Sequence, residues 1–174
     1  MYGCRPEQNA QPRSAYATCA DFCESFVRDL QPLYLLAFLL TGSHAEAEQC
    51  FVATVEEALR ARDVFKGWER SWTKRCLITN AIRRVFPEPA ESNAKQDDGC
   101  AVEVDSQVCF TINAVTRLAP ALQRLTFVMS VLERYSEHEC ALLLGRTPRD
   151  VDQARIHALW QLSGFTPALA KVAG

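Results

Sequence analysis

The sequence predicts an all-α protein: two small helical domains joined by an acidic linker. Apolar residues recur at helical spacing in both halves of the chain, and no stretch alternates convincingly as a strand would. Between the halves, residues 87–107 contain two prolines, few large apolar side chains and six acids against one lysine. That composition is typical of a linker.

The first domain is expected over residues 21–86, after a loose N-terminal tail over residues 1–20 that contains Pro, Gln and Asn. Asp21 and Glu24 have the spacing of a capping box, so we expect the first helix to begin there.

Further start and stop signals divide the rest of this domain. Pro32 can begin a second helix, and Gly42 is a good C-terminal stop. Ser43, followed three residues later by Glu46, gives a third helix a strong start signal. The second, third and fourth helices are therefore expected over about 32–42, 43–62 and 68–86.

The second domain is expected over residues 108–165, followed by a tail over 166–174. Its four predicted helices cover about 108–118, 120–134, 136–144 and 148–162.

The last two of these helices form a candidate helix-turn-helix. Ser136 and Glu139 make a capping box, and the short helix that they begin ends at Gly145. Thr147 can cap the next helix, with Asp150 three residues later. A carboxylate there faces the free N–H groups of its own helix, which gives Asp150 a local structural role.

The face of that last helix that points away from the core carries potential base readers. At about 100° per residue, Val151, Ala158 and Leu162 define the buried stripe. Arg and Gln side chains read base edges in the major groove. The residues expected on the outward face are Arg149, Gln153, Ile156 and Trp160, with His157 and Asp152 on its flanks. Residues 118–162 have five arginines and five acids, which is little positive charge for an autonomous DNA-binding module.

Composition restricts the class of protein. The net charge of −2 argues against a protein that coats nucleic acid indiscriminately. The N-terminus has no apolar run of the kind found in secretory signals, and the longest apolar stretch, residues 33–40, is far shorter than a membrane span. We therefore expect a cytoplasmic protein with no membrane association.

Eight cysteines are scattered along the chain, so neither a disulfide framework nor a cofactor site is expected. Cys19 and Cys23 could share a helix face but have no second ligand pair, so we predict no metal. Cys50, Cys76 and Cys140 lie among apolar residues and are expected to pack as small hydrophobic side chains.

Positive charge is concentrated between Arg60 and Phe86, where eight basic residues and two acids give a net charge of +6. Phe65, Trp68 and Trp72 are interleaved with these bases. Basic side chains neutralise phosphates and aromatic faces stack on unpaired bases, so this segment predicts a nucleic-acid surface. The alternative is a solvated basic helix whose tryptophans fill the core. The linker, with a net charge of −5, could occupy the basic surface when no nucleic acid is bound.

The order and spacing of these features resemble bacterial RNA polymerase sigma factors of the extracytoplasmic-function type. Residues 22–49 look like the family's opening helices, with a leucine-rich helix that ends in Gly. Residues 71–85 resemble the next helix, with Trp72 and Asn80 about two turns apart. Residues 118–159 resemble the family's region four, with its L-x-P, Y-S-x-x-E and L-L-G elements.

The resemblance implies a specificity subunit without catalysis of its own, which binds core RNA polymerase and promoter DNA and can be held by an anti-sigma factor. The side chains implied for the minus-ten element are Lys66, Arg70, Trp72, Lys74, Arg75, Asn80, Arg83 and Arg84. Those implied for the minus-thirty-five element are Arg146, Thr147, Arg149, Gln153 and His157. Those implied for polymerase binding are Glu46, Glu48 and Gln49.

Two departures from the family pattern leave a second hypothesis open. Gln49, Val52 and Ala53 stand where the family usually has an Asp, Gln and Glu that help to hold the polymerase clamp. Asp152 stands where a Lys is common. The alternative is a sigma-like adaptor or regulator that binds protein partners and no longer initiates transcription. An enzyme has little support, because the three histidines lie apart and no nucleophile motif or phosphate loop is present.

Overall fold

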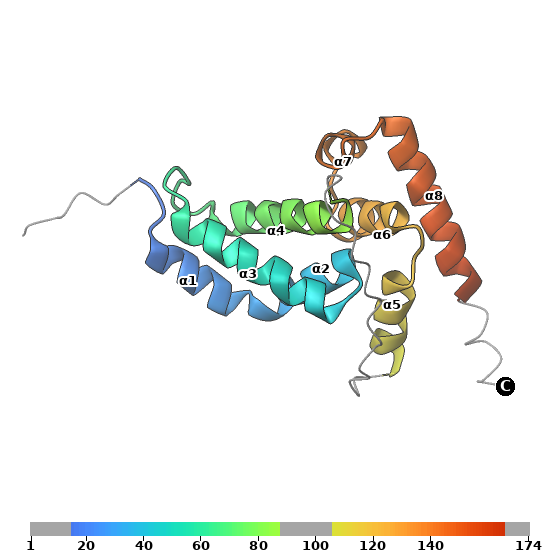
Figure 1. Ribbon diagram of the computed structural model, residues 1–174, viewed down its shortest axis with the longest axis horizontal. Helices are drawn as coiled ribbons and strands as arrows, with labels where there is room; N and C mark the ends of the chain where they lie inside the picture. The colour runs from blue at the N-terminus through green and yellow to red at the C-terminus, as the bar shows by residue number, and fades with distance from the viewer. Residues whose placement is uncertain (1–14, 88–105, 166–174) are drawn as a thin grey trace, which may run out of the picture.

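The computed structural model describes residues 15–87 and 106–165, and the predicted tails and linker lie largely outside this part. The described residues are helical apart from turns and one isolated β-bridge, between Tyr16 and Phe65, which confirms the all-α prediction (Figure 1). The helices are α1 (Cys19–Arg28), α2 (Leu30–Thr41), α3 (His44–Arg60), α4 (Glu69–Val85), α5 (Ser106–Thr116), α6 (Ala121–Phe127), the π-helical turn η1 (Val128–Leu132), α7 (Glu137–Leu144) and α8 (Pro148–Phe165).

The first helix begins earlier than its sequence pattern indicates. Thr18 is the N-cap of α1, and its hydroxyl accepts a hydrogen bond from the Asp21 backbone N–H while the Asp21 carboxylate accepts one from the Thr18 N–H. The predicted box between Asp21 and Glu24 is therefore wrong by one turn. Asp21 fills the third position of the helix and leaves Glu24 exposed on the helix surface.

The start of α3 is where the sequence predicts it, but without the predicted side-chain cap. Ser43 is the N-cap residue and makes no capping hydrogen bond. Glu46 pairs instead with Arg84 on α4, at 3.3 Å, so its carboxylate joins two helices.

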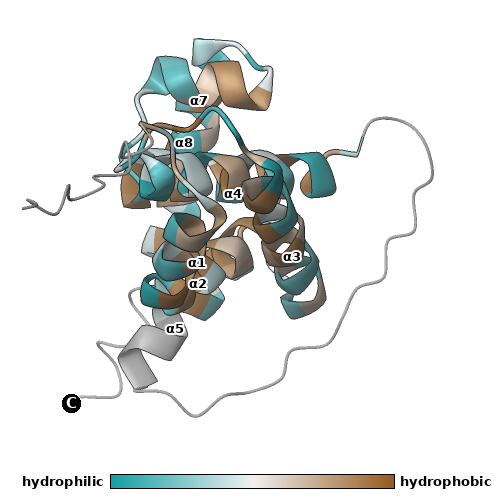
Figure 2. Cartoon of the chain, turned by 90° about the vertical axis from the view of Figure 1, so that its left-hand side faces the viewer, coloured by the Kyte–Doolittle hydropathy of each residue, from teal (hydrophilic) through white to brown (hydrophobic). Residues whose placement is uncertain are grey.

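Helix α2 lies at the centre of the first half, packed by α1, α3 and α4. This position explains its nearly continuous apolar sequence, because the successive pairs Leu36–Ala37 and Leu39–Leu40 are buried and together span nearly half of the helix surface. By contrast, α3 buries its small residues Ala47 and Ala58. Figure 2 shows that hydrophilic and hydrophobic residues both occur along this helix.

The helix predicted over 120–134 is continuous over residues 121–132, and its last turn is the π-helical η1. There the Glu133 N–H bonds to the Val128 carbonyl, five residues back, at 3.0 Å. Arg134 follows with a φ of +60°, a left-handed conformation that is uncommon for a residue with a side chain. The chain can then turn into α7, which begins with the predicted Ser136–Glu139 capping box.

The second half packs against the first. Helices α5 and α6 contact α2, while α8 crosses α6 and packs on α7 (Figure 1). Buried residues of both halves form one connected core, to which the second half contributes Val115, Leu118, Leu125 and Met129. The division into two domains stays a prediction.

Three cysteines pack in the core, as predicted. Cys50 and Cys140 are fully buried and Cys76 is 8% exposed, and Cys19 and Cys23 are exposed free thiols. Burial raises the pKa of Cys50 and Cys140 to about 11 each. Within the described part of the chain, no three His, Cys, Asp or Glu side chains are grouped to hold a metal. Nor is any helix there long and apolar enough to cross a membrane.

Candidate nucleic-acid interface

Most of the basic residues predicted to contact the minus-ten element are paired with carboxylates from neighbouring helices. Lys66 pairs with Asp21 at 3.0 Å, and Arg83 pairs with Glu57 at 3.4 Å. Arg84 donates to Glu46 at 3.3 Å and to the amide oxygen of Gln49 at 2.7 Å. The net charge of +6 in the sequence is therefore strongly reduced on the folded surface.

Two more pairs extend this pattern. The Nε of Arg70 lies 3.1 Å from Oδ2 of Asp29, a buried carboxylate oxygen that has no hydrogen bond in good geometry. Lys74 pairs with Glu133, which belongs to the second half of the chain. The side chains of Lys66, Arg70 and Arg83 are 61%, 62% and 66% exposed. The Arg83–Glu57 pair, which is exposed on both sides, contributes only about 0–1 kcal/mol, so a phosphate can compete for this cation.

Two members of the predicted set contribute to packing within the first half, one of them buried and the other half-buried. Asn80 is 6% exposed and donates to the Thr54 hydroxyl at 3.2 Å, which joins α4 to α3. Trp72 packs edge-on against Phe22, with ring centroids 5.4 Å apart. Both residues stabilise the first half from within. That Asn80 contacts DNA stays a prediction, and its buried side chain presents little surface to a base.

An exposed aromatic cluster, which we call the aromatic platform, lies just before α4. It consists of Tyr16, Phe65 and Trp68, which are 44%, 51% and 67% exposed. Tyr16 stacks on Phe65 with centroids 5.1 Å apart, and Phe65 meets Trp68 edge-on at 6.2 Å. Exposed aromatic side chains in contact, beside cations, are the elements of a surface that stacks on unpaired bases.

Backbone geometry holds the aromatic platform in place. The Ala17 N–H donates to the Val64 carbonyl at 2.7 Å, and the Lys66 N–H donates to the Ala15 carbonyl at 3.0 Å. These two bonds attach the segment before α1 to the segment before α4. Gly67, with a φ of +92°, makes the turn between Phe65 and Trp68, where a residue with a side chain would be strained.

Helices α7 and α8, the candidate helix-turn-helix, are joined by a short turn. Helix α7 ends at Gly145 in the left-handed conformation, and Thr147 begins α8 with reciprocal hydrogen bonds to Asp150. The Thr147 hydroxyl donates to the Asp150 carboxylate at 2.7 Å. Hydrogen bonds from Thr147, first from its side chain and then from its backbone, lower the pKa of Asp150.

The acids of α8 are therefore engaged within the helix itself. Asp150 takes part in the cap, and Asp152 accepts a hydrogen bond from Arg155 at 2.5 Å. Neither carboxylate is an isolated charge facing a DNA groove. Arg149 and Gln153 remain exposed, as predicted for readers of the minus-thirty-five element.

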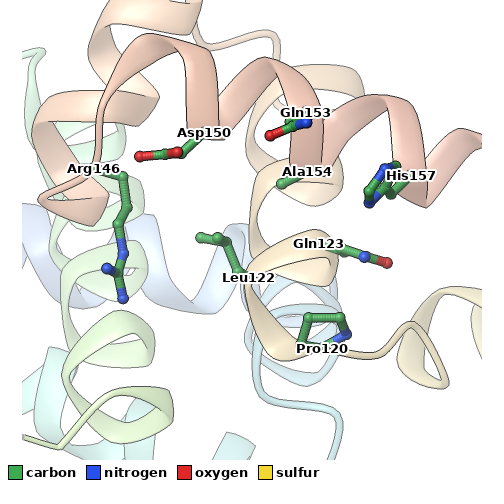
Figure 3. A pocket seen from close by; sticks show the side chains of 8 residues that line it. All are labelled: Pro120, Leu122, Gln123, Arg146, Asp150, Gln153, Ala154 and His157. Atoms are coloured by element: carbon green, nitrogen blue, oxygen red, sulfur yellow. The ribbon is translucent and has the colours of Figure 1, made fainter.

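A hollow of about 430 Å³ lies between α6 and α8 (Figure 3). Three residues assigned to the minus-thirty-five element, Arg146, Gln153 and His157, line this hollow together with Gln123 of α6. Arg149 does not line it. The guanidinium of Arg146 also lies over the ring of Phe86, 5.9 Å from its centroid, and so contacts the end of the first half.

The residues assigned to polymerase binding lie on α3. Glu48 and Gln49 line a hollow of about 420 Å³ with Val52, Ala53 and Glu56. Arg84, which the resemblance assigns to DNA, lines the same hollow and holds Glu46 and Gln49. Arg84, implied for DNA binding, is therefore bonded to Glu46 and Gln49, which are implied for polymerase binding.

Sequence reasoning missed one residue of this interface, Tyr16, and one contact between the two halves, made by Arg124. Tyr16 falls in the predicted N-terminal tail, and the only signal for it was its aromatic side chain in an otherwise polar segment. Arg124 lies in an unremarkable helical pattern, yet its guanidinium donates to the carbonyls of Leu40 and Thr41 at 3.1 and 2.8 Å. No local pattern marks a contact across more than 80 residues.

Comparison with protein-family models returned no match for this chain, and comparison with curated proteins returned none either.

Proposed function

We propose that this protein is a sigma-type specificity subunit that binds core RNA polymerase and promoter DNA. The observation that carries the proposal is the aromatic platform of Tyr16, Phe65 and Trp68. It is an exposed stacking surface at the start of the basic helix α4, in a chain that also contains a capped helix-turn-helix. In such a protein, the platform would take unpaired bases of the melted minus-ten element.

The helix-turn-helix supports the same proposal. The N–H groups at the start of α8 partly offset the charge of Asp150, and Arg155 pairs with Asp152, which reduces the electrostatic objection to α8 as a DNA-reading helix. Arg149 and Gln153 are available for base edges. Little net positive charge remains, so α8 would bind DNA only weakly by itself. Polymerase would hold both DNA-binding surfaces of the protein near the promoter. This tethering would raise the effective concentration of each surface at its DNA element.

The first test uses a fluorescently labelled single-stranded oligonucleotide and binding anisotropy at moderate salt. Trp68→Ala should weaken binding about tenfold, because one stacked base contributes about 1–3 kcal/mol. Trp160→Ala is the matched control, since Trp160 is 74% exposed but lies on α8, in the other half of the chain. Equal affinities for wild type and Trp68→Ala would remove the platform from the proposed interface.

A second candidate function is a sigma-like adaptor that acts through protein contacts. The specific observation in its favour is the internal pairing of Arg84 with Glu46 and Gln49, which engages residues that the family uses for polymerase and DNA. Exposed apolar residues on α8, Ile156 and Trp160, also favour a protein surface.

Co-elution with bacterial core RNA polymerase discriminates between the two candidates. A stable complex at moderate salt supports the specificity subunit. A folded protein that forms no complex favours the adaptor.

A further inference from the structure

The hollow between α6 and α8 is lined by a buried side chain whose hydrogen bonding is incomplete. Gln123, in the first turn of α6, is 8% exposed. Its backbone N–H donates to the Pro120 carbonyl at 2.9 Å, but no residue in the described part of the chain donates to its side-chain Oε1. A buried acceptor without a donor destabilises a fold, so such atoms are rare in structural positions. A ligand in the hollow could supply the donor.

The rest of the lining has the character of a small-molecule site. Leu122 and Ala154 supply half-buried and buried apolar surface, and the exposed side chains of Arg146, Gln153 and His157 supply hydrogen-bonding groups. Ligand pockets in proteins have volumes of roughly 300–1,000 Å³ and combine apolar surface with a few polar groups. At about 430 Å³, the hollow is large enough for an organic ligand rather than a simple ion.

The polar groups differ between the two ends of the hollow (Figure 3). Arg146 and Asp150 lie toward one end, and Gln123 and His157 toward the other. Asp150 and His157 are two turns apart on α8, about 10 Å along the helix axis. A ligand that reaches both ends must therefore be elongated and must carry different groups at its two ends.

The first end suits a phosphate with a neighbouring hydroxyl. The guanidinium of Arg146 has the geometry to bind a phosphate. A bare anion would be repelled by the carboxylate of Asp150, which lines the same hollow. Both hydrogen bonds from Thr147 go to Oδ2 of Asp150, so Oδ1 can accept from a ribose hydroxyl.

The second end suits adenine. A Gln side chain pairs with adenine through two hydrogen bonds, in which Oε1 accepts from the amino group and Nε2 donates to a ring nitrogen. Adenine would thus give Oε1 of Gln123 the donor that the fold does not supply. Its flat ring could lie against the apolar surface of Leu122 and Ala154.

We propose that the hollow between α6 and α8 binds an adenine nucleotide, with the base at Gln123, the ribose at Asp150 and the phosphate at Arg146. This inference goes beyond the proposed function, and nucleotide binding is tested without DNA. Three residues that line the hollow, Arg146, Gln153 and His157, are also those implied for the minus-thirty-five element. A bound nucleotide would therefore compete with DNA for the same side chains.

Isothermal titration calorimetry of the full chain with adenosine monophosphate (AMP) tests the site. Wild type should bind AMP more than about tenfold more tightly than inorganic phosphate. It should also prefer AMP about tenfold over purine riboside 5′-monophosphate, which has the same ring system, ribose and phosphate but no amino group. If AMP does not bind, or if inorganic phosphate binds as tightly, the proposal is overturned.

Gln123→Met removes the amide from a side chain of similar shape. It should lower the affinity for AMP about tenfold and abolish the preference for AMP over the analogue without the amino group. Thr126→Val is the matched control. Thr126 is fully buried on the same helix, its Oγ1 also lacks a partner in the described part of the chain, and it does not line the hollow. Equal AMP affinities for the two variants would place the nucleotide elsewhere and overturn the proposal.

Unfolding in urea distinguishes an amide that binds a ligand from one that only stabilises the fold. Each substitution removes a buried polar atom that lacks a partner, so each should raise the midpoint of unfolding without AMP. Saturating AMP should raise the midpoint of wild type and Thr126→Val more than that of Gln123→Met. A lower midpoint for Gln123→Met without AMP would show that the fold already uses the amide, and would overturn the proposal.

DNA binding separates this inference from the proposed function. At ten times its dissociation constant, AMP should weaken binding of wild type to minus-thirty-five DNA about tenfold, as expected for competition. DNA affinity that is unchanged by bound AMP would overturn the competition between the two ligands. AMP binding with the expected response to Gln123→Met, but no DNA binding by any variant, would support the nucleotide site and overturn the proposed function.

Discussion

The guanidinium of Arg124 donates to the Thr41 carbonyl at 2.8 Å, immediately beside Gly42, where α2 ends. Gly42 has a φ of +77°, and a Cβ at this position would lie 3.0 Å from Cζ of Arg124. The glycine therefore does two things: it ends the helix in a left-handed conformation and leaves room for a side chain from the other half of the chain.

Gly42→Ala should destabilise the protein more than Gly145→Ala. Both glycines are helix C-caps with positive φ, so each substitution carries a backbone cost of about 1–2 kcal/mol. Nothing lies within 4 Å of a Cβ at Gly145, while one at Gly42 displaces Arg124 from its carbonyl partners. We expect an additional loss of about 1 kcal/mol at Gly42 in the free energy of unfolding, measured with urea. Equal losses would show that Arg124 moves aside without cost.

Asn80→Ala should weaken the fold and leave DNA affinity unchanged at temperatures where the variant is folded. Loss of the buried hydrogen bond to Thr54 should cost about 1–3 kcal/mol in urea unfolding. Arg75→Ala is the complementary variant, because Arg75 is exposed on the same helix. Arg75→Ala should leave the free energy of unfolding nearly unchanged. It should reduce the slope of log affinity against log salt concentration by about 1, the value for one lost phosphate contact. If Asn80→Ala lost DNA affinity without loss of stability, Asn80 would be a DNA-binding residue.

Asp21 should make stability depend on pH in the acid range. Hydrogen bonds from Thr18, followed by the contact with Lys66, lower the pKa of Asp21 from 3.8 to about 2. Because the folded value lies below the unfolded one, the stabilisation is fully present above about pH 4 and is lost as pH falls through about 2. The gap in unfolding free energy between wild type and Asp21→Asn should therefore shrink from pH 6 to pH 2.

Glu24→Gln is the control for the Asp21 measurement. Glu24 is exposed on α1 and lies outside the Thr18–Asp21 cap. Its substitution should leave the unfolding free energy nearly unchanged at pH 6. A loss as large as that of Asp21→Asn would indicate that Glu24 takes part in capping after all.

The cysteines should differ in their reactivity with iodoacetamide at pH 8. Burial, together with a hydrogen bond to Glu57 at 2.8 Å, raises the pKa of Cys76 to about 12. Little thiolate is then present, so Cys76 should stay unlabelled in the folded protein, as should the buried Cys50. Peptide mapping should find Cys19 labelled, since it is exposed. In urea all three should react, and equal labelling without urea would contradict the burial of Cys50 and Cys76.

Local signals in the sequence predicted local structure well. The capping box of Ser136 with Glu139, the stop at Gly145 and the cap at Thr147 each involve residues within four positions of one another, and the structure confirms them. The same reasoning misplaced the cap of α1. Thr18–Asp21 and Asp21–Glu24 have equal spacing, and only the backbone conformation of Thr18 decides between them.

The candidate site was harder to predict because its character depends on contacts between distant residues. The basic segment looked strongly positive because Asp21, Asp29 and Glu133, which neutralise part of it, lie elsewhere in the chain. The aromatic platform depends on Tyr16, which reaches Phe65 through backbone hydrogen bonds that no periodicity in the sequence marks.

The π-helical turn η1 has a consequence for the direction in which the chain leaves α6. A π turn contains one residue more than the α-helical turn that it replaces, and Leu132 is the last residue of this helical segment. One position corresponds to about 100° around a helix axis. The extra residue therefore sets the direction in which the chain departs toward α7, and the removal of one residue from 128–132 would redirect both α7 and α8.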